Sequence, residues 1–348
     1  MERKEDEMND VTLGSTGITV PQNAFGALPL QRIGHDAAVA LLRRAYEGGM
    51  RYFDTARVYT DSEEKVGDAF DGMRDKIFLA TKTRAQTPEQ FDADLATSLE
   101  LLRTDWIDVY QFHQADQVWR PGDGTGMYER MLAAKEAGKI RHIGITAHKI
   151  RVAFEAVESG LYETLQFPFS YLSGEQELQL VEACRTHNVG FVCMKGLAGG
   201  LITNSAAAMA WMGRFDNALP IWGIQREAEL DEWLSFMDET PAWTPEMEAF
   251  VERERAELAG SFCRGCGYCM PCPMGIQINN CARMALMLRR APTTNWLSER
   301  WQAEMAKIED CLHCNQCAAK CPYELDTPAL LERNLEDYRR VLAGEVAV

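Results

Sequence analysis

Short apolar runs alternate with longer amphipathic segments along residues 24–238. The runs are rich in β-branched and aromatic residues, which are typical of strands, and the segments between them repeat apolar residues at helical spacing. This alternation predicts strands at residues 24–28, 50–54, 77–81, 106–111, 140–145, 164–167, 190–194 and 218–223, with helices in the intervals. Thr87 before Pro88 begins one such helix, and Gly138 and Gly160 end two others.

Eight βα units in about 250 residues are the size and order of a closed parallel barrel, because right-handed crossovers leave few other arrangements. A doubly wound open sheet is the alternative fold. The first predicted strand is not followed by Gly-x-Gly-x-x-Gly, however, so the dinucleotide-binding motif of the open-sheet fold is missing. We therefore predict an α/β protein with a TIM (β/α)8 barrel in residues 1–255.

The cysteines are concentrated near the C-terminus. Of the 11 cysteines, only Cys184 and Cys193 lie outside residues 263–321, and we interpret these two as buried barrel thiols. The others form two runs, and the second run matches the C-x2-C-x2-C-x3-C-P spacing of bacterial ferredoxins. Clustered thiols in a chain without a secretory signal usually bind metal. Residues 256–348 are therefore predicted to form a small, mostly helical ferredoxin-like domain, with helices at 276–290 and 296–309.

Two 4Fe-4S clusters follow from the two cysteine runs. In such ferredoxins the fourth cysteine of each run binds the other cluster. One cluster would then take Cys263, Cys266, Cys269 and Cys321, and the other Cys311, Cys314, Cys317 and Cys272, which leaves Cys281 spare. The first run has two residues instead of three before its fourth cysteine, so the fourth ligand is less well defined there. Structural zinc is the alternative, but zinc sites usually consist of two C-x2-C pairs, whereas the cysteines here form triplets that are followed by Cys-Pro.

Composition and charge indicate the cellular compartment and argue against some classes of partner. No apolar run approaches the roughly 18 residues of a membrane span, and the N-terminal residues are charged, so we expect a cytoplasmic protein without a signal peptide. The net charge of -16 makes nucleic acid and anionic membranes poor partners because both would be repelled.

Polar residues stand where the predicted strands end, which is the position of active sites in such barrels. Asp54 ends the second strand, Tyr59 follows in the adjoining loop, Lys82 follows the third strand, and His113 follows the fourth. Taken singly, an Asp–Lys pair at strand ends or a histidine in a loop is more often structural. As a spaced set, the four residues favour a catalytic site. His148 is balanced between a loop role and a cofactor contact, and His142 and His187 are interpreted as surface residues.

The motifs FDTARVY, ATKT, IDVYQFH and GKIRHIGIT resemble the aldo/keto reductases, and the resemblance extends over residues 11–240. It implies that Asp54, Tyr59, Lys82 and His113 form the catalytic tetrad of that family. It also implies that a nicotinamide cofactor binds near Thr146, Gln166, Met194, Lys195 and Arg226. The phrases FGALPLQR, MKGLAGG and FCRGCGYCMPCP are similar to the iron-sulfur branch of this family.

Two of these cofactor positions depart from the family pattern. Met194 replaces an aromatic residue that stacks on the nicotinamide in many members, and only Arg226 and Lys195 remain to bind an adenosine 2'-phosphate. Glu227 and Glu229 would repel that phosphate. We therefore expect NADH to bind at least as well as NADPH.

Carbonyl reduction explains these residue types, because hydride transfer to carbon leaves an alkoxide that needs a proton. Tyr59 supplies the proton if its pKa falls by roughly 2 to 3 units from ~10. We expect Lys82 to lower the pKa of Tyr59, Asp54 to keep Lys82 charged, and His113 to donate a hydrogen bond to the substrate carbonyl.

Three functions are compatible with these features. The first is an NAD(P)-dependent reductase of a small carbonyl compound, or a dehydrogenase of the corresponding alcohol, whose clusters are structural or sense redox state. The second is an electron-transfer enzyme, in which the clusters pass electrons from a ferredoxin or flavodoxin, through a flavin, to an acceptor in the barrel. The third is a non-catalytic sensor, which the intact tetrad disfavours because a binding protein needs no general acid.

Overall fold

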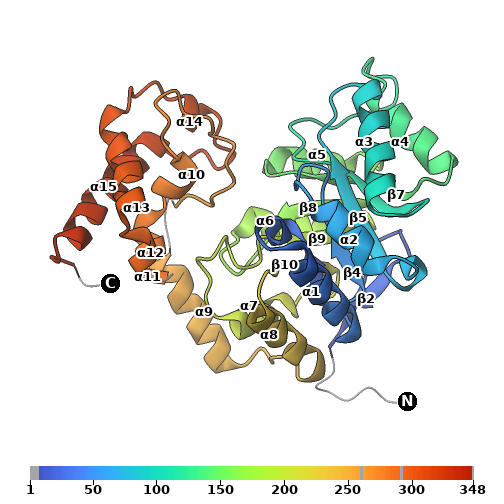
Figure 1. Ribbon diagram of the computed structural model, residues 1–348, viewed down its shortest axis with the longest axis horizontal. Helices are drawn as coiled ribbons and strands as arrows, with labels where there is room; N and C mark the ends of the chain where they lie inside the picture. Colours follow the sequence, from blue (N-terminus) through green and yellow to red (C-terminus); the bar gives the residue numbers. More distant parts are fainter. Residues whose placement is uncertain (1–7, 259–261, 291–292, 347–348) are drawn as a thin grey trace. The chain divides into compact units, whose positions relative to one another are not determined.

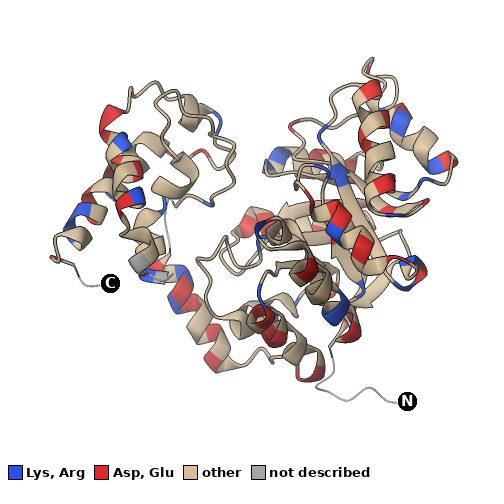
Figure 2. Cartoon of the chain, viewed as in Figure 1, with Lys and Arg blue, Asp and Glu red and all other residues tan. Residues whose placement is uncertain are grey.

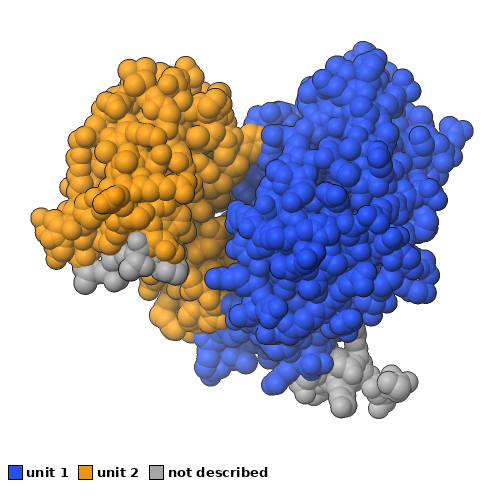
Figure 3. Space-filling model, in the orientation of Figure 1, with its two compact units in different colours: residues 1–196, 205–247 blue, residues 197–204, 248–348 orange. Residues whose placement is uncertain are grey.

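The computed structural model describes residues 8–258, 262–290 and 293–346. The chain divides into two compact units (Figure 3). The first contains residues 1–196 and 205–247, and the second contains residues 197–204 and 248–348. The sequence-based boundary at residue 255 falls inside helix α9 (Pro245–Glu257).

The first unit is a closed barrel of eight parallel strands with helices around it (Figure 1). The strands follow one another around the barrel in the order β10-β3-β4-β5-β6-β7-β8-β9. Their bounds are β3 (Ala24–Gly26), β4 (Tyr52–Asp54), β5 (Phe78–Thr83), β6 (Ile107–Phe112), β7 (Ile140–Thr146), β8 (Thr164–Pro168), β9 (Gly190–Met194) and β10 (Ala218–Gly223). The predicted TIM barrel is therefore confirmed, and each predicted strand is present.

A helix follows each strand of the barrel. These helices are α1 (His35–Glu47), α2 (Ser62–Phe70), α3 (Pro88–Leu101), α4 (Met127–Glu136), α5 (Ile150–Glu158), α6 (Glu175–Thr186), α7 (Ser205–Met212) and α8 (Glu227–Asp238). Short 3-10 helices, η1 (Leu28–Arg32) and η2 (Arg74–Lys76), lie in two of the loops. The Thr87 hydroxyl accepts a hydrogen bond from Gln90 N at 3.3 Å, which caps α3 as its sequence predicts.

A small hairpin closes the end of the barrel where the strands begin. Strands β1 (Asp10–Thr12) and β2 (Thr19–Pro21) pair antiparallel, and their apolar residues join the barrel core with Tyr52 and Val109. Gly14 has a φ of +49°, and a Cβ there would lie 2.4 Å from Gly190 N, so only glycine fits. The opposite end, where the strands finish, is the end that carries the polar residues.

The second unit is mostly helical, as predicted. Its helices are α9 (Pro245–Glu257), α10 (Ile278–Cys281), α11 (Met284–Arg290), α12 (Thr293–Trp296), α13 (Glu299–Ala306), η3 (Lys307–Asp310), α14 (Gln316–Ala319) and α15 (Thr327–Leu342). The prediction of one continuous helix at 276–290 is wrong, because the chain breaks between α10 and α11. The Asn334 side chain donates to Ala282 O at 3.1 Å and accepts from Ala285 N at 2.8 Å, and these bonds stabilise the break.

Acidic residues are spread over the helices of both units (Figure 2). This distribution agrees with the net charge of -16. Within the described ranges, no helix is long and apolar enough to span a lipid bilayer.

Candidate active site and cysteine cavities

Asp54 and Lys82 form a buried ion pair at the end of the barrel where the strands finish. Asp54 is the last residue of β4, Lys82 lies in β5, and both side chains are almost fully buried. Lys82 Nζ donates to Asp54 Oδ1 at 2.5 Å and to Thr55 O at 2.5 Å. Burial raises the pKa of Asp54 and lowers the pKa of Lys82, and the charge of each residue opposes the shift of the other.

Tyr59 and His113 lie beside this ion pair. Lys82 Nζ is 5.3 Å from the centroid of the Tyr59 ring, and the rings of Tyr59 and His113 meet edge to face with centroids 5.7 Å apart. The backbone N–H of His113 donates to Thr83 O at 2.8 Å, which ties the residue after β6 to the end of β5. The structure therefore brings together the four residues that the sequence proposed as a tetrad.

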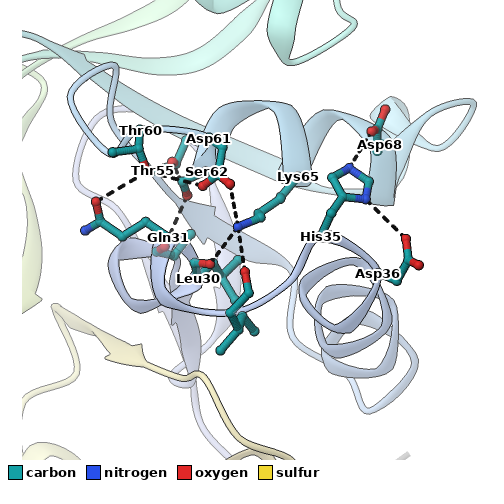
Figure 4. A network of polar contacts seen from close by, with 12 residues as sticks. Leu30, Gln31, His35, Asp36, Thr55, Thr60, Asp61, Ser62, Lys65 and Asp68 are labelled. Carbon is teal, nitrogen blue, oxygen red and sulfur yellow. Dashed lines mark hydrogen bonds and ion pairs between the residues drawn. The ribbon is translucent and has the colours of Figure 1, made fainter.

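A polar network holds residues that precede and follow Tyr59 in the chain (Figure 4). Ser62 Oγ donates to Ala27 O at 3.1 Å and lies 2.9 Å from Thr55 Oγ1. The buried Lys65 donates to Leu30 O at 2.9 Å and pairs with Asp61 at 2.8 Å. These contacts fix both ends of the loop, and they therefore fix the position of Tyr59.

The pKa of Tyr59 differs from our expectation. Burial raises the pKa of Tyr59, the charge of Asp54 raises it further, and only Arg84 opposes the shift. The expectation that Lys82 lowers this pKa is therefore wrong, because Lys82 is paired with Asp54 and the charge of Asp54 raises the pKa. The phenol stays protonated at neutral pH.

The two buried histidines near Tyr59 are neutral. Burial lowers the pKa of His113 well below its usual range, and the positive charges of Lys82 and Arg84 lower it further. Burial and the charge of Lys195 lower the pKa of His148 in the same way. His113 Nδ1 has no hydrogen-bond partner within the described part of the chain, so a neutral ring with one donor N–H is available to a bound molecule.

Glu63, which the sequence did not single out, forms a second buried carboxylate behind the tetrad. It accepts hydrogen bonds from Thr81 Oγ1 at 2.6 Å and Ser98 Oγ at 2.8 Å, and it pairs with Arg57. Burial raises the pKa of Glu63, and the bonds from Thr81, Ser98 and Arg57 oppose that shift. Its contacts cross from α2 to β5 and α3, so Glu63 supports the strand that positions Lys82.

Two cavities in the second unit are lined by cysteines. Cavity I has a volume of about 340 Å³, and the cysteines in its wall are Cys263, Cys266, Cys269 and Cys321. Cavity II has a volume of about 410 Å³, and its cysteines are Cys269, Cys272, Cys311, Cys314 and Cys317. Each cavity thus draws cysteines from both runs, which is the arrangement that the crossed ferredoxin pattern requires. Cys269 lies in the wall of both cavities, so four cysteines line cavity I and five line cavity II.

The remaining cysteines lie elsewhere. Cys281 lines neither cavity, and its thiol donates to Glu304 O across 4.0 Å. Burial raises the pKa of Cys281 to about 12, so it is a protonated thiol at neutral pH. Cys184 and Cys193 are buried in the barrel, where burial also raises the pKa of each thiol.

Comparison with known proteins agrees with both units. The profile of the aldo/keto reductase family matches residues 22–242, which is more than half of the chain. The chain belongs to the aldo/keto reductase family. A 4Fe-4S dicluster domain profile matches residues 262–326, so this aldo/keto reductase also carries an iron-sulfur domain of the ferredoxin type.

Several curated aldo/keto reductases are similar to this one. Aldo-keto reductase yakc [NADP(+)] of Schizosaccharomyces pombe is 29% identical over 214 residues, which are 54% of this chain and 61% of the relative. Aldo-keto reductase YhdN of Bacillus subtilis is 31% identical over 182 residues, which are 48% of this chain and 54% of the relative. The chain thus spans little more than half of the length of these relatives.

Solved structures share the barrel. The holo form of an aldo-keto reductase from Bacillus halodurans has a TM-score of 0.62 and 22% identity, covering 71% of this chain and 96% of that chain. An aldo-keto reductase from Klebsiella pneumoniae, solved in complex with NADPH, has a TM-score of 0.60 and 22% identity, covering 71% and 94% of the two chains. These similarities agree with the fold of this aldo/keto reductase.

The residues proposed to contact a nicotinamide lie on neighbouring strands of the reductase barrel. Thr146 ends β7 and Gln166 lies in β8, and both are buried. Gln166 Nε2 donates to Asp54 Oδ1 at 3.5 Å, and its Oε1 has no partner among the residues that the structure describes. Thr146 Oγ1 accepts a hydrogen bond from Gln114 N at 2.7 Å. Met194 ends β9, where it packs against the barrel core.

The two basic candidates for a nucleotide phosphate differ in their surroundings. Lys195 follows β9 and has a φ of +59°. Arg226 is the residue before α8, and its guanidinium donates to Glu229 Oε1 from Nε at 2.8 Å and from Nη2 at 2.5 Å. The sequence treated Arg226 as a basic residue and Glu229 as a repelling acid, but the structure pairs the two. Arg226 would have to leave this pair to bind a phosphate.

Proposed function

We propose that the barrel reduces a carbonyl group with hydride from a nicotinamide cofactor, and that Tyr59 donates the proton. The observation that supports this most strongly is the placement of a protonated, partly buried phenol beside the neutral His113 and the Asp54–Lys82 pair. The bound nicotinamide would supply the hydride. Every other step belongs to side chains of this chain.

His113 orients the substrate. A neutral imidazole donates one hydrogen bond to the carbonyl oxygen and so stabilises the negative charge that develops on that oxygen. Tyr59 then transfers its phenolic proton to the same oxygen. Lys82 lies beside the Tyr59 ring and is held in place by Asp54, so this pair positions the phenol for proton transfer.

The raised pKa of Tyr59 favours reduction over oxidation. Alcohol oxidation requires the phenol to lose its proton before the reaction, whereas carbonyl reduction requires the protonated form. We therefore propose that the enzyme acts as a carbonyl reductase near neutral pH. Oxidation of the corresponding alcohol should increase as the pH rises.

Thr146, Gln166 and Met194 are proposed to hold the nicotinamide. Gln166 Oε1 and the Thr146 hydroxyl are the polar groups at the ends of β8 and β7 that suit a carboxamide. Lys195 and Arg226 are proposed to face the phosphates. Because Arg226 is paired with Glu229, we expect no strong preference for a nucleotide with a 2'-phosphate. NADH and NADPH should both serve as the cofactor.

The iron-sulfur unit is proposed to hold two 4Fe-4S clusters. Cavity I would use Cys263, Cys266, Cys269 and Cys321, and cavity II would use Cys272, Cys311, Cys314 and Cys317. Hydride transfer moves two electrons together and needs no single-electron carrier. We therefore assign the clusters a structural or redox-sensing role in this reaction.

A second function is favoured by the exposure of cavity II. Leu312 in its wall is 63% exposed, and Cys314 is exposed as well. A cluster there would lie at the protein surface, where a ferredoxin or flavodoxin could deliver electrons to it. In this alternative the electrons would pass to an acceptor in the barrel, such as a flavin.

A donor comparison separates the two functions. Anaerobic wild-type protein and a Cys314→Ser variant are assayed with para-nitrobenzaldehyde, once with NADPH or NADH and once with reduced ferredoxin. Nicotinamide-driven reduction that persists in the variant supports the reductase. Turnover that occurs only with ferredoxin, and that is lost in the variant, supports electron transfer and contradicts the reductase.

A further inference from the structure

Arg283 lies in the turn between α10 and α11, and part of its guanidinium is buried without a partner. Its Nε and Nη1 atoms are both buried, and neither has a hydrogen-bond acceptor among residues 8–258, 262–290 and 293–346. The ion pairs of this described part include none for Arg283, although Arg289 on α11 pairs with Asp337 at 2.7 Å. Burying N–H groups of a cation without an acceptor is costly, so an anion beside Arg283 would stabilise this part of the unit.

The guanidinium lies between two glycine backbones. A Cβ on Gly265 would lie 2.9 Å from Nη1 and 3.0 Å from Cζ of Arg283, and a Cβ on Gly199 would lie 2.7 Å from Nη1. Both glycines have positive φ values, +65° and +68°. The close approach of the guanidinium therefore depends on glycine at both positions.

Arg283 lies against the loop that carries the first cysteines of cavity I. Its guanidinium approaches Gly265, which lies between Cys263 and Cys266, two of the cysteines that line this cavity. The backbone N–H of Gly265 donates to Cys263 Sγ at 3.3 Å. The buried N–H groups of Arg283 thus lie against the loop that would bind a cluster, although Arg283 is not itself part of the cavity wall.

Gly199 connects the same guanidinium to a different part of the chain. Residues 197–204 follow β9 and precede α7, yet they belong to the second compact unit. Met194 and Lys195, which we propose to bind the cofactor, lie just before this segment. If a cluster holds the guanidinium of Arg283 in place, it therefore also holds residues 197–204, which continue from the cofactor-binding strand β9.

We propose that Arg283 is the counter-charge of the cluster in cavity I and that this cluster, through Arg283, holds residues 197–204 in place. The proposal rests on the proposed cluster in that cavity. A cluster with four thiolate ligands is anionic and gains negative charge when it is reduced. A fixed cation beside it stabilises the reduced form and raises its reduction potential. Arg283 should have no comparable effect on the cluster in cavity II.

The first test is a redox titration of the anaerobic, full-length protein, with dithionite as the electron donor and electron paramagnetic resonance as the readout. Arg283→Gln should lower the midpoint potential of one cluster and leave the other unchanged, and Arg283→Lys should restore most of the difference because it keeps the charge. Arg289→Gln is the matched control, since it removes an arginine that pairs with Asp337 on the surface. Equal potentials in wild type and Arg283→Gln would overturn the proposal.

The second test uses only wild-type protein, so its outcome does not depend on whether a variant folds. Hydrogen exchange of residues 197–204 is compared in wild-type protein before and after the iron is removed by an oxidant and a chelator. Exchange should become about tenfold faster or more without the cluster, since a charge-assisted hydrogen bond is worth at least that factor. Unchanged exchange would overturn the proposal. An iron count on the starting protein separates this failure from the failure of the cluster assignment, because protein with zinc and no iron refutes the clusters themselves.

Discussion

The most informative perturbation of the barrel is the removal of one charge from the buried Asp54–Lys82 pair. Both side chains are at most 3% exposed, and Asp54 and the Thr55 carbonyl are the acceptors of Lys82 among the residues that the structure describes. Asp54→Asn leaves the ammonium group without its counter-charge. Breaking a buried pair in this way typically costs about 3–5 kcal/mol. Each kcal/mol lowers the Tm of a domain of this size by roughly 2–4 °C, so the expected decrease is about 6–20 °C.

The double variant Asp54→Leu/Lys82→Met tests the cause of this loss. Replacing both charges by apolar side chains of similar volume removes the unpaired ammonium, so most of the lost stability should return. Asp231→Asn is the control, because it breaks an exposed pair with Arg44 that should contribute less than about 1 kcal/mol. Thermal unfolding of the four proteins, followed by near-ultraviolet circular dichroism, measures the differences. Our reasoning is refuted if Asp54→Asn is as stable as the wild type, or if the double variant is no more stable than the single one.

Four further predictions follow from the same structure. The pKa values of His113 and His148 are lowered in the folded protein, so both residues bind protons more readily in the unfolded state. The free energy of unfolding should therefore fall below pH 6.5, by up to about 1.4 kcal/mol per pH unit for each histidine. Urea unfolding at pH 7.5 and at pH 5.5 measures this difference, and equal stabilities would refute it. Arg84 is exposed, binds the neutral Gln114 side chain and acts electrostatically on Tyr59, so we expect it to bind an anionic group of a substrate. Arg84→Gln should then lower kcat/KM for para-carboxybenzaldehyde by about tenfold or more and spare para-nitrobenzaldehyde; equal losses for both would refute this role. Glu229→Gln should free Arg226 and strengthen NADPH binding relative to NADH, which fluorescence titration of both nucleotides tests and an unchanged ratio contradicts. Anaerobic protein should contain about eight iron atoms per chain by elemental analysis, and air should bleach its colour while the barrel stays folded; zinc without iron would contradict the clusters.

The barrel could be predicted because its signal is local and repeated. Each strand is a short apolar run with turn residues on both sides, and the eight runs occur in the order that a closed barrel requires. The hairpin of β1 and β2 escaped prediction because it precedes the repeated βα units. Its strands have three residues each, and no helical segment follows either of them to mark them as part of the repeat. The spacing of Gly14 and Gly17 between Val11 and Val20 was the available signal.

The four tetrad residues could be located from the sequence, but their electrostatics could not. Strand ends and a family resemblance were sufficient to place Asp54, Tyr59, Lys82 and His113 together. The direction of the Tyr59 pKa depends on burial and on whether Lys82 is already neutralised by Asp54, and neither can be read from a linear sequence. A lysine near a tyrosine therefore predicted a lowered pKa where the structure gives a raised one.

In the second unit too, contacts between residues that are far apart in the sequence could not be predicted. The two predicted sets of cysteines lie in the walls of the two cavities, although Cys269 lies in the wall of both. The break between α10 and α11 is stabilised by Asn334, which lies about 50 residues further along the chain. The position of Arg283 between Gly199 and Gly265 also joins segments that are far apart in sequence. Such contacts exist only once the unit has folded.

A comparison of two Tyr→Phe variants tests whether Tyr59 donates the proton in carbonyl reduction. Tyr52→Phe is the control, because the Tyr52 hydroxyl is buried at the start of β4 and has no hydrogen-bond partner in the described residues. Reduction of para-nitrobenzaldehyde by NADPH is measured in single turnovers, and nucleotide affinity is measured by fluorescence. Tyr59→Phe should slow reduction by at least ~100-fold with unchanged nucleotide affinity, while Tyr52→Phe reacts as the wild type does. A wild-type rate in Tyr59→Phe would contradict the account.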